Sequence, residues 1–268
     1  MEEKLLQMKS LVERLNQASD SYYNGKGELM TDYEWDALFD QLKRLEEETG
    51  EILPDSPTNR VSEDSIVGKK EEHEFAALSL AKTKQVSDLV KWAEDRPIWI
   101  SWKLDGLTLV VTYDGGKLTK IVTRGNGHIG TNITHLAPAI SGIPAAISEK
   151  GHLVVRGEAV ISYADFEQFI IESEGDYANP RNLASGSLTL KDIEEVKQRH
   201  IQWIPFTLVY TERELTSWGE RMQMLKDLGM NPVERERIDH PTTENIQQEI
   251  DKFTEKVTSK KNPFPVDG

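Results

Sequence analysis

The hydrophobic period changes once along the chain, and this change divides the sequence into two parts with different secondary structure. In the first part apolar residues recur every three or four positions, as Leu5, Met8 and Leu15 do, which places them on one face of a helix. From about residue 99 apolar residues alternate every second position, which is typical of half-buried strands. The sequence therefore predicts a helical unit followed by a unit built largely on sheets.

The helical part is predicted to be a hairpin of two helices with a turn at residues 24–27. Thr31 and Glu34 form a T-x-x-E capping box at the start of the second helix, and Gly50 is placed to end it. Pro54 and Pro57 then break the helical pattern.

A linker is expected over residues 62–72, which are charged and almost without apolar side chains. We therefore predict two domains, a helical one over residues 1–66 and a larger one over residues 67–268.

The larger part is predicted to be an α+β domain with antiparallel sheets, because its strands and helices do not alternate regularly. Asp114-Gly115-Gly116 should join two strands as a hairpin, and Ser162 should cap a short helix that runs through Phe166 and Phe169. The expected strands are residues 99–103, 107–113, 117–124, 153–161 and 201–210, and the last helices are residues 218–228, ending at Gly229, and 244–257.

Composition excludes several classes of protein. The chain carries 32 Lys and Arg against 46 Asp and Glu, a formal net charge of −14, so it is not expected to grip nucleic acid unaided. It has no cysteine, which excludes disulfides, thiolate catalysis and cysteine-ligated zinc. No run approaches the roughly 18 apolar residues of a membrane span, and no signal peptide is recognisable, so we expect a cytoplasmic protein without a membrane partner.

The strongest chemical motif is Lys103-Leu104-Asp105-Gly106, which joins two predicted strands. A lysine amine is a nucleophile only when neutral, so burial near Trp99 and Trp102 would have to lower its pKa. The glycine could let the backbone approach a ligand. An ordinary surface lysine before a turn is the alternative.

Further motifs follow in a fixed order, and together they resemble the NAD-dependent bacterial DNA ligases over essentially the whole chain. Tyr22-Tyr23, residues 32–36 and Pro54-Asp55-Ser56-Pro57-Thr58 resemble the family's helical NMN-binding subdomain. The segment from His73 to Leu80, the lysine motif, Thr123-Arg124-Gly125, Arg156-Gly157-Glu158, residues 178–182 and Gly186-Ser187-Leu188 resemble its nucleotidyltransferase domain.

The resemblance implies that Lys103 and Asp105 are the catalytic pair. Lys103 would attack the α-phosphorus of NAD, release nicotinamide mononucleotide and retain AMP as a phosphoramidate. Glu158 would accept a hydrogen bond from a ribose hydroxyl, and Arg124 would contact ribose or phosphate. For Glu158, a charge within an apolar strand also needs a reason of its own.

The resemblance also implies adenine contacts at Ser79, Leu80, Ser101 and Phe206. Phe206 lies within Trp203-Ile204-Pro205-Phe206 and could equally be core.

The helical subdomain would select NAD as the donor. Asp32 and Asp36 are four residues apart and share a helix face with Trp35 beside them, which offers carboxylates and an aromatic ring to a cationic nicotinamide ring. Together with Tyr22, these residues are our candidates for nicotinamide recognition. A dipole role for Asp32 and a core role for Trp35 are the alternatives.

The chain departs from the family pattern at several places. Ser101 replaces the usual glutamate, Asn126 an aspartate, Thr189 an arginine and Tyr23 a histidine. The sequence stops at Pro265-Val266-Asp267-Gly268, before the family's further catalytic lysine and its DNA-gripping domains, so we expect a truncated or divergent member.

The function we predict is the adenylation half of an NAD-dependent DNA ligase, with magnesium as cofactor and nicked duplex DNA as partner of the full-length protein. Two alternatives remain at this stage. An ATP- or GTP-dependent nucleotidyltransferase would share the lysine motif but would not need the helical hairpin. A silent paralogue would bind nucleotide without forming an adduct.

Overall fold

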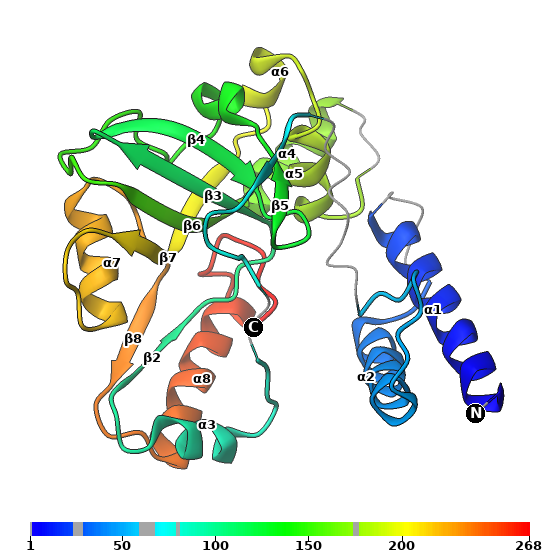
Figure 1. Cartoon of the computed structure of the whole chain (residues 1–268). Coiled ribbons are helices and arrows are strands. Elements are labelled where there is room, and N and C mark those ends of the chain that lie inside the picture. The colour runs from blue at the N-terminus through cyan, green and yellow to red at the C-terminus, as the bar shows by residue number, and fades with distance from the viewer. Residues whose placement is uncertain (1, 24–28, 59–67, 79–80, 174–176) are drawn as a thin grey trace.

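A computed structural model of the chain describes residues 2–23, 29–58, 68–78, 81–173 and 177–268. The predicted α+β class is confirmed, because helices and three antiparallel sheets make up the fold (Figure 1). The turn predicted at residues 24–27 lies outside the described residues.

The N-terminal unit is a pair of helices, α1 (Glu2–Tyr23) and α2 (Asp32–Thr49). The predicted capping box of Thr31 and Glu34 is present, and Gly50 ends α2 in the left-handed conformation. The 3–4 spacing brings its apolar side chains together in one small core. The buried members of this core are Met8, Leu11, Val12, Leu15, Leu42 and Leu45.

The stretch that leaves this unit is tied back to α2. Glu46 is buried, and its two carboxylate oxygens accept hydrogen bonds from Ser56 Oγ at 2.5 Å and Thr58 Oγ1 at 2.6 Å. A buried carboxylate needs such donors, since an unpaired one would cost several kcal/mol. The segment that the two prolines keep out of a helix is thus fixed by side-chain hydrogen bonds.

The central sheet of the larger part has the order β4-β3-β6-β7 and is antiparallel throughout. Gly115 and Gly116, with φ of 59° and 77°, form the predicted hairpin, since glycine adopts such positive angles without strain. The strands are β3 (Leu107–Asp114), β4 (Lys117–Thr123), β6 (Leu153–Val160) and β7 (Gln202–Thr211).

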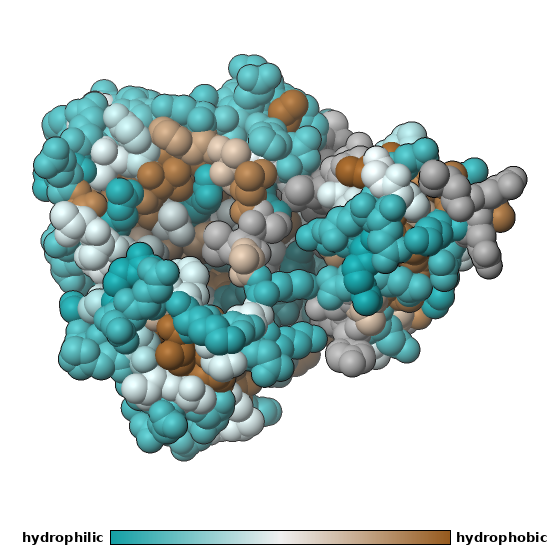
Figure 2. Space-filling model, turned by 60° about the horizontal axis from the view of Figure 1, so that its bottom comes forward, coloured by the Kyte–Doolittle hydropathy of each residue, from teal (hydrophilic) through white to brown (hydrophobic). Residues whose placement is uncertain are grey.

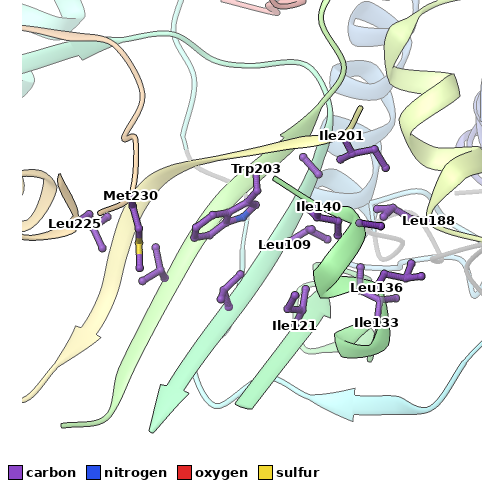
Figure 3. Packing of buried hydrophobic residues seen from close by; sticks show 14 of the residues in the cluster. Leu109, Ile121, Ile133, Leu136, Ile140, Leu188, Ile201, Trp203, Leu225 and Met230 are labelled. Atoms are coloured by element: carbon purple, nitrogen blue, oxygen red, sulfur yellow. The ribbon is translucent and has the colours of Figure 1, made fainter. Parts of the chain in front are cut away.

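The main core lies on one face of this sheet. Leu109 and Ile121 on the strands face Leu136 on one of the covering segments, and the Trp203 ring extends toward Met230 (Figure 3). Those segments are η1 (Thr134–Ala139), α4 (Tyr163–Ser173), α5 (Pro180–Ser187), α6 (Ile193–Lys197) and α7 (Trp218–Asp227).

A second, narrower body is built on a two-stranded ribbon. Strand β2 (Ile98–Ser101) pairs with β8 (Arg235–Ile238), and the ribbon packs against α3 (Val86–Ala93) and α8 (Thr243–Thr258) (Figure 1). Sequence periodicity predicted β2 and α8 but not α3 or β8.

The predicted linker needs one correction. Its last three residues form strand β1 (Lys70–Glu72), which pairs with β5 (Ile129–Thr131). Their charge hid the strand, because backbone pairing, rather than apolar burial, holds these residues to β5. Residues 62–67 lie outside the described part.

No helix in the described ranges is both long and apolar enough to cross a membrane. The face in Figure 2 is largely hydrophilic and carries separate hydrophobic areas instead of one continuous apolar surface.

Candidate active site

Lys103 lies in the short connection between β2 and β3, and the end of the chain holds its backbone. Lys103 N donates to the Gly268 carbonyl at 2.6 Å, and Asp267 N donates to the Lys103 carbonyl at 2.8 Å. Asp105 N donates to the Pro265 carbonyl at 2.9 Å, and Leu104 forms a bridge with Val266. The lysine motif is therefore clamped as a short antiparallel pair.

The Lys103 amine is reachable from solvent, since its side chain is 67% exposed, and it forms an ion pair with Asp267. Desolvation by the surrounding protein lowers the pKa of Lys103, with Asp105 opposing that shift and Arg181 adding to it. A lowered pKa is what a nucleophilic amine needs at neutral pH.

Gly106 is required for packing. A Cβ there would meet the Ala159 carbonyl oxygen at 2.2 Å and a Val160 methyl at 2.8 Å. The glycine thus lets the lysine loop lie directly on β6, which is a structural reason in addition to the approach of a ligand.

Asp105 is paired with Arg181, whose Nη1 lies 2.5 Å from Asp105 Oδ1. Arg181 comes from the first turn of α5, which begins at Asn179 with an N-cap hydrogen bond and Pro180 at N1. This arginine falls within the motif of residues 178–182 but is not among the candidates that the sequence suggests. Its charge acts on the lysine, which adds it to the candidate site.

Glu158 is 8% exposed, on β6 directly opposite Thr108 of β3. Its Oε2 accepts a hydrogen bond from Thr108 Oγ1 at 2.8 Å. Desolvation raises the pKa of Glu158 to about 7, although Thr108, Arg181 and the Gly106 N–H all favour the charged form. The carboxyl is thus balanced between its two protonation states near neutral pH.

Arg124 lies at the end of β4 and, with Arg156, holds the segment that precedes residues 79 and 80. Arg124 Nε donates to the Ala77 carbonyl at 3.1 Å, and Arg156 Nη2 donates to those of Phe75 and Ala76 at 3.1 and 2.7 Å. This segment, residues 73–78, lies over the face of the central sheet opposite the main core. We call it the strap.

A histidine fastens the strap to the central sheet. His152 Nδ1 lies 2.6 Å from Asp114 Oδ1, and its Nε2 lies 2.9 Å from Glu74 Oε2. The hydrogen bond to Asp114 raises the pKa of His152, and Glu74 adds to the effect.

His152 therefore predicts a pH dependence of stability. Its raised folded-state pKa means that the stabilisation is complete below the unfolded value of about 6.5 and is lost as pH rises through the folded value. Both carboxylates face solvent, so the effect should stay below about 1 kcal/mol. Urea unfolding at about pH 6 and about pH 9 should show a smaller loss in His152→Gln than in the unaltered chain; equal losses would contradict the assignment.

Of the four predicted adenine contacts, Ser101 and Phe206 lie among the described residues. Ser101 ends β2, and its hydroxyl has no hydrogen-bond partner among the described residues. Phe206 is half-buried and packs against a cluster that includes Trp102, Val160 and Phe253, an arrangement that fits its alternative role in the core. Ser79 and Leu80 lie outside the described residues.

In the helical unit, Trp35 packs inside the pair. Its ring stacks on Phe39 with centroids 4.8 Å apart, and its indole N–H donates to the Leu15 carbonyl at 3.4 Å. These contacts favour the core role for Trp35. The side chains of Tyr22, Asp32 and Asp36 lie outside the described part of the chain.

The site's donor set fits a dinucleotide better than a bare metal ion. Lys103 and Arg181 offer cations to phosphate, and Glu158 offers an acceptor to a hydroxyl. No three Asp, Glu or His side chains gather closely enough to hold a metal by themselves within the described residues.

Comparison with known proteins identifies the family. The family model for the NAD-dependent DNA ligase adenylation domain matches residues 69–268, and the one for the DNA ligase-like, N-terminal NAD+-binding domain matches residues 1–62. DNA ligases of Lachnoclostridium phytofermentans and Ruminiclostridium cellulolyticum are each 38% identical over 274 residues, which is all of this chain and 41% of each relative.

More distant proteins agree less closely. A Leptospira biflexa DNA ligase is 34% identical, over 97% of this chain and 39% of its own. A solved mycobacterial DNA ligase D, complexed with ATP and MES, is 19% identical with a TM-score of 0.33, over 52% of this chain and 40% of that one, a likeness too slight to carry an argument. The chain spans about two fifths of the length of the curated relatives it matches. Because the two family models together cover nearly the whole sequence, the chain belongs to the NAD-dependent DNA ligases.

Proposed function

We propose that this chain adenylates itself on Lys103 with NAD as the donor. The observation that carries the proposal is Lys103 itself. Its amine is exposed, has a lowered pKa and interacts electrostatically with Arg181 and Glu158. The match of residues 1–62 to an NAD+-binding domain supports NAD over ATP.

The reaction transfers the adenylyl group of NAD to the lysine amine. The lone pair of Lys103 Nζ attacks the α-phosphorus of the adenylate half, and the amine loses a proton. The bond from that phosphorus to the bridging oxygen breaks, and nicotinamide mononucleotide leaves with the oxygen. The product is a phosphoramidate that joins AMP to the lysine.

The neighbouring side chains position this step. Arg181, held by Asp105, can donate to a phosphate oxygen, where a guanidinium suits the charge and geometry. Glu158 can accept from a ribose hydroxyl. Asp267 favours the ammonium form of Lys103, so its pairing must give way before the amine attacks.

Other expectations are part of the same proposal. Residues 1–66 would form the NAD-selecting domain, with Tyr22, Asp32, Trp35 and Asp36 as candidate contacts, and residues 67–268 the adenylation domain. Arg124, Ser79, Leu80, Ser101 and Phe206 would complete the nucleotide site. Magnesium would accompany the phosphates of NAD, whose negative charge it would neutralise.

The full-length protein would pass AMP to the 5′-phosphate of nicked duplex DNA, during repair and replication in the cytoplasm. The present chain is acidic, which is consistent with other regions of the full-length protein supplying most of the DNA-binding surface.

Labelled NAD tests the proposed function. With the label in the adenylate half, the protein should become covalently labelled, whereas a label in the nicotinamide half should be released. Retention of the nicotinamide label on the protein would contradict the proposed bond cleavage.

A further inference from the structure

Glu158 is a buried carboxyl surrounded by few groups that can hold it. Among the charged groups that act on it, Asp105 disfavours its ionisation and Arg181 favours it. Lys103 also feels the charge of Glu158. Thr108 donates a direct hydrogen bond, and the Gly106 N–H also favours the charged form. Thr108 supplies the only side-chain hydroxyl among these partners in the described residues.

The sheet register fixes how Thr108 meets Glu158. The two residues are direct partners in the antiparallel pairing of β3 and β6, so their side chains lie on the same face of the sheet. Both strands continue on either side and carry buried residues, Leu109 on β3 and Gly157 and Ala159 on β6. A β-branched threonine in such a strand has a restricted χ1 angle. The 2.8 Å hydrogen bond is therefore held by two well-anchored backbones.

We propose that Thr108 is a positioning residue for the adenylation reaction, whose hydroxyl holds the Glu158 carboxylate in its orientation and in its ionised form. The proposal rests on the proposed function for its consequence in the reaction. Its first part, the hold of Thr108 on Glu158, stands on the contact alone.

The Thr108 hydroxyl matters because opposing effects act on the ionisation of the Glu158 carboxyl. Burial pushes the carboxyl toward its neutral form, and each donor pushes it back. Removing one donor to a charged group should raise the pKa of Glu158 by about one unit above its value of about 7. A smaller fraction of the molecules should therefore carry an ionised Glu158 near neutral pH without the Thr108 hydroxyl.

Thr108→Val replaces the hydroxyl by a methyl group of similar shape. If ionised Glu158 is the reactive acceptor, lysyl-AMP formation should fall about fivefold near pH 7 and return to the unaltered rate above about pH 9. Dividing the variant rate by the unaltered rate at each pH removes the pH dependence that the two chains share. Thr108→Ser keeps the donor and should follow the unaltered chain.

The matched control is Thr112→Val. Thr112 lies on the same strand and the same face, paired with Val154, four residues from Thr108. The same loss of a hydroxyl there should leave the rate profile unchanged. A general effect of Thr→Val on strand β3 would instead appear in both variants.

The direct measurement is an NMR titration of the Glu158 carboxyl in chains with 13C-labelled glutamate, assigned with Glu158→Gln. An upward shift in Thr108→Val, its absence in Thr108→Ser and Thr112→Val, and a rate ratio that recovers with pH support the proposal. An unshifted titration, or a rate ratio that is flat over pH, overturns it. If the unaltered chain forms no adduct, the proposed function fails, and the titration alone still decides whether Thr108 holds Glu158.

Discussion

Lys103→Ala is expected to abolish covalent transfer of AMP from NAD, with a fall in rate of at least about 10⁴-fold. Its neighbours Asp105 and Arg181 remain, but neither can form the phosphoramidate. The side chain is largely exposed, so the substitution should leave the free energy of unfolding almost unchanged. Intact-protein mass spectrometry after incubation with NAD and magnesium measures the loss.

Lys103→Arg is the matched control for charge. It can keep the ion pair with Asp267, but a guanidinium does not lose its proton under these conditions and so cannot attack phosphorus. Both variants should therefore lack the adduct and retain the circular dichroism of the unaltered chain. An adduct that persists in either would show that another residue is the nucleophile.

Removal of residues 1–66 is expected to reduce the reaction with NAD below detection. Residues 1–62 match the NAD+-binding domain, and the helices α1 and α2 have a core of their own, separate from that of the central sheet. The remaining part keeps its buried core and should unfold cooperatively. Mass spectrometry of the shortened chain with NAD measures the effect.

The order of events separates donor recognition from chemistry. A protease site placed within residues 59–66 would allow the adduct to be formed first and the helices to be removed afterward. The adduct should survive this cleavage, because the lysine, Asp105, Arg181 and Glu158 all lie in the larger part. Unimpaired reaction of the shortened chain with NAD would contradict the role of the helical unit.

Local signals were sufficient to predict the helix pair and the main strands. The capping box at Thr31, the stop at Gly50 and the glycine hairpin at residues 115–116 depend on backbone chemistry within a few residues. Strands β1 and β8 were missed because they are short and charged, and their stability comes from partners 57 or more and 134 or more residues away. Such pairing leaves little local signal.

The candidate site divides in the same way. Sequence motifs marked Lys103 and Glu158, but the pairing of Asp105 with Arg181 and of Glu158 with Thr108 exists only once β3, β6 and α5 are assembled. The sequence suggests no role for Asp267, because its contact with Lys103 depends on the return of residues 265–268 to the lysine motif.

Self-adenylation of Lys103 can be followed by intact-protein mass spectrometry with NAD or ATP as separate donors. We expect a mass gain of one adenylyl group with NAD and magnesium, no gain with ATP and magnesium, and no gain with either donor in Lys103→Ala. A gain from ATP alone, or no gain from NAD in the unaltered chain, would show that Lys103 is not adenylated by NAD as proposed.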